Sequence, residues 1–141
     1  MNFKAIILAA GKGTRMKSKY PKVVHKVCGK EMVNHVISVS KKSGVNDIVA
    51  ILGHESDVVK EKLPKDTMIA MQTDQLGTGH AVMMAKEYIN DNDTIVVLCG
   101  DTPLVKEETL KRLSKKEINS LVKSLKLKRL FNEEQSIRLS N

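Results

Sequence analysis

Apolar residues follow two alternating patterns along most of the chain. Short, mostly apolar runs bounded by turn-forming residues are typical of buried strands, and apolar residues every three or four positions are typical of helices. Strands are predicted at 3–8, 48–52, 67–71 and 94–99, and helices at 31–43, 56–63 and 79–89. Near-continuous apolar strands that alternate with helices indicate a parallel sheet covered on both faces. We therefore expect an α/β fold, a three-layer sandwich around a mostly parallel sheet.

Composition places the chain among ordinary soluble domains. It has 141 residues, of which 41% are hydrophobic and 28% charged, and this length suits one domain. The longest apolar runs, at 5–10 and 95–99, are too short to cross a bilayer, and the first run is not followed by a secretory cleavage pattern. We expect a cytoplasmic protein with no membrane partner. Cys28 and Cys99 lie in apolar surroundings, which predicts core or near-core thiols rather than a disulfide.

The formal net charge of +8 is unevenly distributed. Residues 1–105 carry a net charge of +3 and residues 106–141 a net charge of +5. Nucleic-acid binding also uses aromatic side chains as stacking platforms, and the chain has only two tyrosines and two phenylalanines. We therefore expect no nucleic-acid partner.

The first predicted strand leads into a glycine-rich, cationic loop. Residues 8–22 read Leu-Ala-Ala-Gly-Lys-Gly-Thr-Arg-Met-Lys-Ser-Lys-Tyr-Pro-Lys. Gly11 and Gly13 let successive backbone N–H groups face one anion, and Arg15 and Lys22, with two lysines between them, add positive charge. The loop fits neither the dinucleotide fingerprint nor the Walker A motif. It predicts a nucleoside triphosphate site; the alternative is a tight turn with surface lysines.

A second polar loop follows the third predicted strand. It reads Gln-Thr-Asp-Gln-Leu-Gly-Thr-Gly-His-Ala from Gln72. Amide groups both donate and accept hydrogen bonds, so Gln72 or Gln75 is a candidate for reading the edge of a base. Gly77 permits close backbone approach, and Thr78 offers a hydroxyl at a helix start. The alternative is an ordinary loop with Thr78 near an N-cap.

A third loop follows the fourth predicted strand. Asp101 stands beside Gly100 directly after that strand. A carboxylate in this position suits Mg²⁺, which prefers oxygen ligands and is commonly bound together with phosphates. The alternative is that Asp101 caps the following helix. Ligands of such sheets bind beyond the carboxyl ends of the strands, so the three loops predict one shared site.

These three loops resemble the uridyltransferase domains of the bifunctional bacterial enzymes that make UDP-N-acetylglucosamine from UTP and N-acetylglucosamine 1-phosphate. The resemblance covers about residues 2–113 and rests on four segments: 8–16, Pro-Lys-Val-Val-His-Lys from Pro21, 72–81 and 100–104. It implies the Rossmann-like fold of the nucleotide-diphospho-sugar transferases, with UTP and the sugar phosphate as substrates and Mg²⁺ as cofactor.

The resemblance also implies roles for individual residues. Arg15 and Lys22 match the catalytic cations that stabilise the triphosphate and the departing pyrophosphate, and Asp101 matches a Mg²⁺ ligand. In-line attack of the sugar phosphate on UTP needs no protein nucleophile, so the four histidines are expected to be structural or solvent-exposed. The nucleotide-binding positions implied are Leu8, Ala9, Ala10, Gly11, Gly13, Thr14, Gln72, Gly77 and Thr78.

The resemblance ends at Leu113. Members of the family continue with strands that form the sugar pocket and supply a second metal ligand, whereas residues 114–141 read as a basic amphipathic tail. The sequence thus predicts a nucleotide-binding unit at 1–113, incomplete at its C-terminus, followed by a non-homologous tail. A truncated or frame-shifted gene and a natural short form both remain open. So do three functions: a uridyltransferase, a remnant that binds UTP without turnover, and a tail that binds an acidic partner.

Overall fold

The structure, a computed structural model, describes residues 2–11, 17–53 and 56–113. Within these residues the central sheet has the strand order β5-β4-β1-β6, and every neighbouring pair is parallel. The strands are β1 (Phe3–Ala9), β4 (Asp47–Leu52), β5 (Met68–Met71) and β6 (Thr94–Cys99). The four predicted strands and the parallel sheet are confirmed. The predicted helix in the basic tail lies outside the described residues.

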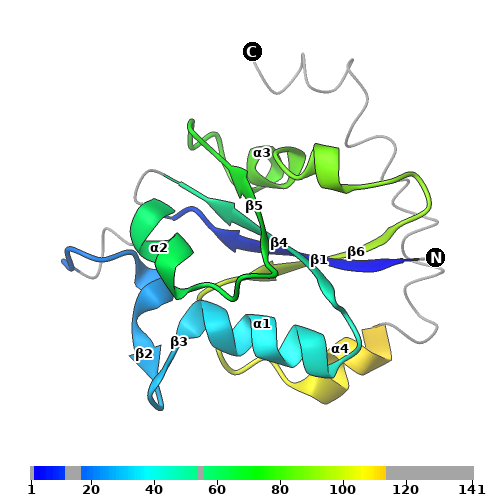
Figure 1. Ribbon diagram of the computed structural model, residues 1–141, viewed down its shortest axis with the longest axis horizontal. Helices are drawn as coiled ribbons and strands as arrows, with labels where there is room; N and C mark the ends of the chain where they lie inside the picture. The colour runs from blue at the N-terminus through cyan, green and yellow to red at the C-terminus, as the bar shows by residue number, and fades with distance from the viewer. Residues whose placement is uncertain (1, 12–16, 54–55, 114–141) are drawn as a thin grey trace.

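Helices cover both faces of the sheet, so the three-layer prediction is confirmed (Figure 1). One face packs against α1 (Met32–Lys42), α2 (Ser56–Lys62) and α4 (Glu107–Arg112), and the other against α3 (Thr78–Met83) and the 3-10 helix η3 (Lys86–Tyr88). In the described part of the chain, no helix has the length and apolar character needed to cross a membrane.

The alternation of side chains along each strand divides the core between the two faces. In β1, Ala5 and Ile7 join the core that contains Val33 of α1, and Ile6 joins the core that contains Ala81 of α3. Successive side chains of a strand point to opposite faces. A strand covered on both sides is therefore apolar at every position, which explains the unbroken apolar runs of the sequence.

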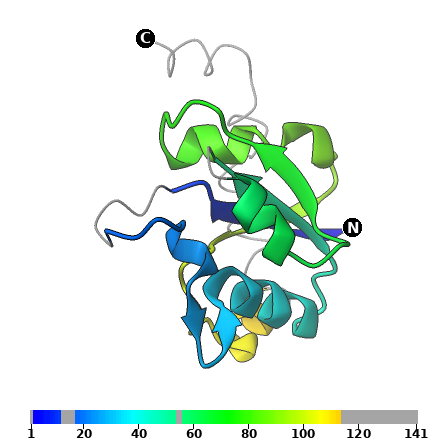
Figure 2. The ribbon, with the colours of Figure 1, turned by 60° about the vertical axis from the view of Figure 1, so that its left-hand side comes forward.

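A short hairpin lies beside α1 (Figure 2) and was not predicted. The 3-10 helix η2 (Lys22–Val24) leads into β2 (Lys26–Val27) and β3 (Lys30–Glu31), which pair antiparallel. The two turn residues, Cys28 and Gly29, have φ of 49° and 79°. Positive φ at both positions is the mark of the type I′ turn that suits a two-residue hairpin.

The prediction of buried cysteines was wrong, since both thiols are exposed. Cys28 is a turn residue of the β2–β3 hairpin and belongs to neither hydrophobic core. Cys99 ends β6, which has a strand neighbour on one side only among the described residues, and Val97 of the same strand is exposed as well. Apolar neighbours in the sequence therefore did not imply burial at a turn or at a sheet edge.

The single helix predicted over 79–89 was wrong in its extent. The structure has α3, a break around Met84 and Ala85, and then η3. Tyr88 explains the break, because it is held at two points: its hydroxyl donates to the Ile69 carbonyl (2.9 Å) and its carbonyl accepts from Lys4 Nζ (2.6 Å). These contacts to β5 and β1 fix the end of the segment, and apolar spacing alone does not reveal them.

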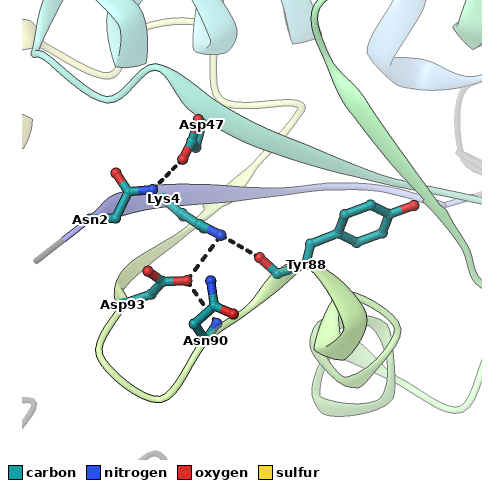
Figure 3. Close-up of polar contacts among 6 residues, drawn as sticks. All are labelled: Asn2, Lys4, Asp47, Tyr88, Asn90 and Asp93. Atoms are coloured by element: carbon teal, nitrogen blue, oxygen red, sulfur yellow. Dashed lines mark hydrogen bonds and ion pairs between the residues drawn. The ribbon is translucent and has the colours of Figure 1, made fainter.

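A buried ion pair closes the amino-terminal edge of the sheet (Figure 3). Lys4 Nζ lies 2.9 Å from Asp93 Oδ2, and the two side chains are 9% and 5% exposed. Asp93 also accepts from the Asn90 N–H at 2.7 Å. This N–H and the Lys4 ammonium hold the pKa of Asp93 below its usual value. The pair therefore ties the turn before β6 to the start of β1.

Candidate functional site

The carboxyl ends of the four parallel strands meet at one edge of the sheet. Ala9 pairs with Leu52, Leu52 with Met71, and Leu8 with Cys99. The residues that leave the strands next are therefore neighbours in space, in the order Gln72, Gly53, Ala10 and Gly100–Asp101. The three polar loops predicted to share a site emerge at this one edge, with the end of β4 between two of them, where ligands of such sheets bind.

Hydrogen bonds join these loops to the neighbouring strand ends. The Gly100 N–H donates to the Leu8 carbonyl (2.9 Å), and the Gln72 N–H donates to the Leu52 carbonyl (2.7 Å). Gln75 Nε2 donates to the Ala10 carbonyl (2.7 Å). Two carbonyls of the predicted nucleotide-binding segment, those of Leu8 and Ala10, thus hold the neighbouring loops in place.

Two glycines at these strand ends are required by close packing, and sequence reasoning did not single them out as site residues. A Cβ on Gly53 would lie 2.6 Å from the Ala10 carbonyl oxygen, and a Cβ on Gly100 would lie 3.0 Å from the Leu8 carbonyl oxygen. The first distance is shorter than real Cβ contacts and the second lies at their lower limit, so a side chain at either position would force the neighbouring backbone to shift. The feature of the sequence that could have identified them is a glycine directly after a predicted parallel strand.

Lys22 and Asp101 come together across the site. Lys22, in η2, places its Nζ 2.9 Å from Asp101 Oδ2, and the side chains are 42% and 38% exposed. The alternative role for Asp101 as a helix cap does not hold, because α4 begins at Glu107 and has Lys106 at its N-cap. A partly exposed carboxylate and ammonium at a strand end form a polar pair that an incoming ligand can reach.

The two candidate base-reading amides differ in burial and in their hydrogen-bond partners. Gln72 is 4% exposed, and its Nε2 lies 3.1 Å from both the Gly77 carbonyl and His80 Nδ1. Gln75 is exposed, and its amide nitrogen serves the Ala10 carbonyl. Thr78 is the exposed first residue of α3, whose N-cap is Gly77 with no side-chain capping hydrogen bond.

Three predicted site residues, Gly13, Thr14 and Arg15, lie outside the described residues. Among the predicted nucleotide-binding positions that the structure does describe, Ala9 is buried and Gly11 is exposed. Two of the histidines make contacts within the fold: His35 Nε2 lies 2.7 Å from the Val27 carbonyl oxygen, and His80 Nδ1 lies 3.1 Å from Gln72 Nε2. His25 Nε2 is buried and has no hydrogen-bond partner among the described residues, and His54 lies outside them.

The fold and the place of this site at the strand ends are those of a nucleotidyltransferase domain. The family model for the MobA-like NTP transferase domain matches residues 5–120, and the chain belongs to that family.

Its sequence is 86% identical over 113 residues to the bifunctional protein GlmU of Clostridioides difficile strain 630, a match that covers 80% of this chain and 25% of the relative. It is 61% identical over 112 residues to GlmU of Alkaliphilus oremlandii, covering 79% of this chain and 24% of the relative. The chain matches the N-terminal region of GlmU and spans about a quarter of the length of these relatives.

Solved structures share the fold at low sequence identity. A nucleotidyl transferase from Methanothermobacter aligns with a TM-score of 0.69 and 20% identity, over 82% of this chain and 57% of that one. Rv0371c from Mycobacterium tuberculosis aligns with a TM-score of 0.68 and 20% identity, over 79% of this chain and 58% of that one. A second structure of that protein is a complex with manganese, with a TM-score of 0.66 and 22% identity over 79% and 57% of the two chains. These likenesses support the α/β fold.

Proposed function

We propose that this chain binds UTP with Mg²⁺ at the strand-end site and transfers the uridylyl group to N-acetylglucosamine 1-phosphate. The observation that carries the proposal is that Gln72, Ala10 and Asp101 follow three strand ends at one edge of the sheet, with Lys22 of η2 paired to Asp101. These groups suit a base, a sugar-phosphate backbone and a metal-bound phosphate chain, respectively. The close similarity to GlmU and the resemblance to uridyltransferase domains supply the particular substrates.

The proposal gives a role to each of the following site residues. Lys22 neutralises charge on the triphosphate and on the departing pyrophosphate. The backbone around Ala10 and Gly11 holds the nucleotide, and Gln72 meets the base. The contacts of Leu8 and Ala10 with neighbouring loops keep these groups in fixed relative positions, which is what in-line displacement requires of the protein.

Asp101 is the residue that would hold Mg²⁺. Its carboxylate is partly exposed at the end of β6, and within the described residues no group of three or more acidic, histidine or cysteine side chains could hold a metal ion. Mg²⁺ usually takes one or two carboxylates and completes its shell with phosphates and water. A single carboxylate therefore fits the ion when the triphosphate is bound, and the bound ion would stabilise charge on the phosphates.

Calorimetric titration of the chain with UTP and Mg²⁺ tests the binding step. We expect saturable binding, weakened by about 1.5–3 kcal/mol in Lys22→Met because a charge-assisted hydrogen bond to phosphate is lost. Lys65→Met, at an exposed position after α2, is the matched control and should bind normally. The absence of heat at millimolar UTP, or equal affinity in Lys22→Met, would contradict the proposed site.

A pyrophosphate-release assay with UTP, Mg²⁺ and N-acetylglucosamine 1-phosphate tests the transfer step. Pyrophosphate release that depends on both substrates supports the uridyltransferase. UTP binding with no release under the same conditions supports the alternative function, a UTP-binding remnant. The positioning of both reactants supplies ~7–11 kcal/mol of barrier lowering, so a chain that holds only UTP would be slower by many orders of magnitude.

A further inference from the structure

The side-chain amide of Gln72 has its orientation fixed by two neighbours. Its Nε2 lies 3.1 Å from the Gly77 carbonyl oxygen and 3.1 Å from His80 Nδ1. A backbone carbonyl can only accept, so the amide group that faces Gly77 is the NH₂ and not the oxygen. Both NH₂ hydrogens are then used, one on Gly77 and one on His80.

The two acceptors are themselves held in place. The Gly77 carbonyl also accepts from the Ala81 N–H at 3.1 Å, as the first bond of α3. His80 stands in the first turn of the same helix. Because an amide nitrogen only donates, this contact requires Nδ1 of His80 as the acceptor and assigns the ring N–H to Nε2. Loss of the ring removes one of the two contacts that keep the amide from turning over.

The remaining acceptor of the amide is Gln72 Oε1, and among the described residues none donates a hydrogen bond to it. At ring position 3 uracil carries an N–H donor, whereas cytosine carries an unprotonated nitrogen. An amide that presents its oxygen to position 3 therefore pairs with uracil and opposes cytosine. An amide turned over to present its NH₂ has the reverse preference. A site built to hydrogen-bond one base in this way rejects the other strongly.

We propose that His80 is a positioning residue for base selection: it keeps the Gln72 amide with its oxygen toward the base, so that the site selects uracil over cytosine. The inference rests on the proposed function, because it assumes that a nucleotide base meets Gln72. It assigns a task in recognition to a histidine that does not touch the reacting atoms.

The test compares the dissociation constants of UTP and CTP, with Mg²⁺, for the whole chain and three variants. In His80→Phe an aromatic ring still fills the position but has no nitrogen to accept a hydrogen bond. We expect the preference for UTP over CTP to fall by about threefold to tenfold, the effect of one neutral hydrogen bond. His80→Asn keeps an acceptor near Nδ1 and should restore most of the preference. Lys86→Ala, at an exposed position in η3, should keep the wild-type preference.

The outcomes separate this inference from the proposed function. An equal loss of affinity for both nucleotides in His80→Phe, or an unchanged ratio, would show a structural role and overturn the inference while leaving UTP binding intact. Wild-type protein that fails to prefer UTP overturns the proposed base preference and the inference with it. If His80→Phe does not fold, a long-range ¹H–¹⁵N spectrum of wild-type protein decides: a proton on Nε2 supports the inference, and a proton on Nδ1 refutes it.

Discussion

Gly53→Ala inserts one methyl group between two strand ends of the site. The new Cβ would stand 2.6 Å from the Ala10 carbonyl oxygen and 3.3 Å from the Ala10 Cα and carbonyl carbon. Because all three neighbours are backbone atoms, no side chain can turn away to make room. The ends of β1 and β4 must separate by about 0.4 Å to reach even 3.0 Å. Overpacking of this kind costs about 1–3 kcal/mol.

The displaced segment is the one proposed to hold the nucleotide, so Gly53→Ala should also weaken UTP binding. Urea denaturation measures the free energy of unfolding, and calorimetry with UTP and Mg²⁺ measures binding. Gly79→Ala is the matched control, because a Cβ there meets no atom within 4 Å, and alanine within a helix is favourable by roughly 0.5–1 kcal/mol. Wild-type stability and affinity in Gly53→Ala would refute the claim that the strand ends are held in close contact.

Three further predictions concern single positions. Gly77→Ala should cost about 1–3 kcal/mol of stability in urea denaturation through backbone strain alone, since φ is 102° and no atom lies within 4 Å of the added Cβ; an unaffected free energy of unfolding would contradict this. Asp93→Asn should cost about 1.5–3 kcal/mol at pH 7 because Lys4 loses its charged partner. The folded-state pKa of Asp93 lies below the unfolded value of 3.8, so the difference from wild type should shrink as the pH falls below about 4; a difference that is constant with pH would exclude the ion pair as its source. Cys28 and Cys99 should both react with a thiol reagent in the folded protein, and protection of either until unfolding would contradict its exposure.

Local pattern was enough to predict most of the secondary structure. The strands were identifiable because a strand covered on both faces is apolar at every residue, and the end of α2 was marked by Pro64. The β2–β3 hairpin was missed because its turn is Cys-Gly rather than the usual Asn-Gly or Asp-Gly. The break after α3 was missed because Tyr88 is fixed by contacts to distant strands.

The candidate site was predicted only in outline. The glycine loop, Gln72 and Asp101 each follow a predicted strand, so their meeting at one sheet edge was expected from parallel topology. Their roles toward a nucleotide stay predictions. The partner of Asp101 could not be inferred, since Lys22 is distant in the chain and the 2.9 Å contact between their side chains depends on how η2 packs.

The sequence by itself determined the alternation of strands and helices and the loops that carry the unusual residues, because these depend on the spacing of apolar side chains and on glycine. Tertiary structure alone decided how individual groups are used: that Gln72 is buried and Gln75 is not, that Gly53 admits no side chain, and that His80 faces an amide. Such outcomes depend on which backbone carbonyls and side chains from separate segments meet, and hydrogen-bond direction and close packing act between neighbours in space. No pattern along the chain records those neighbours.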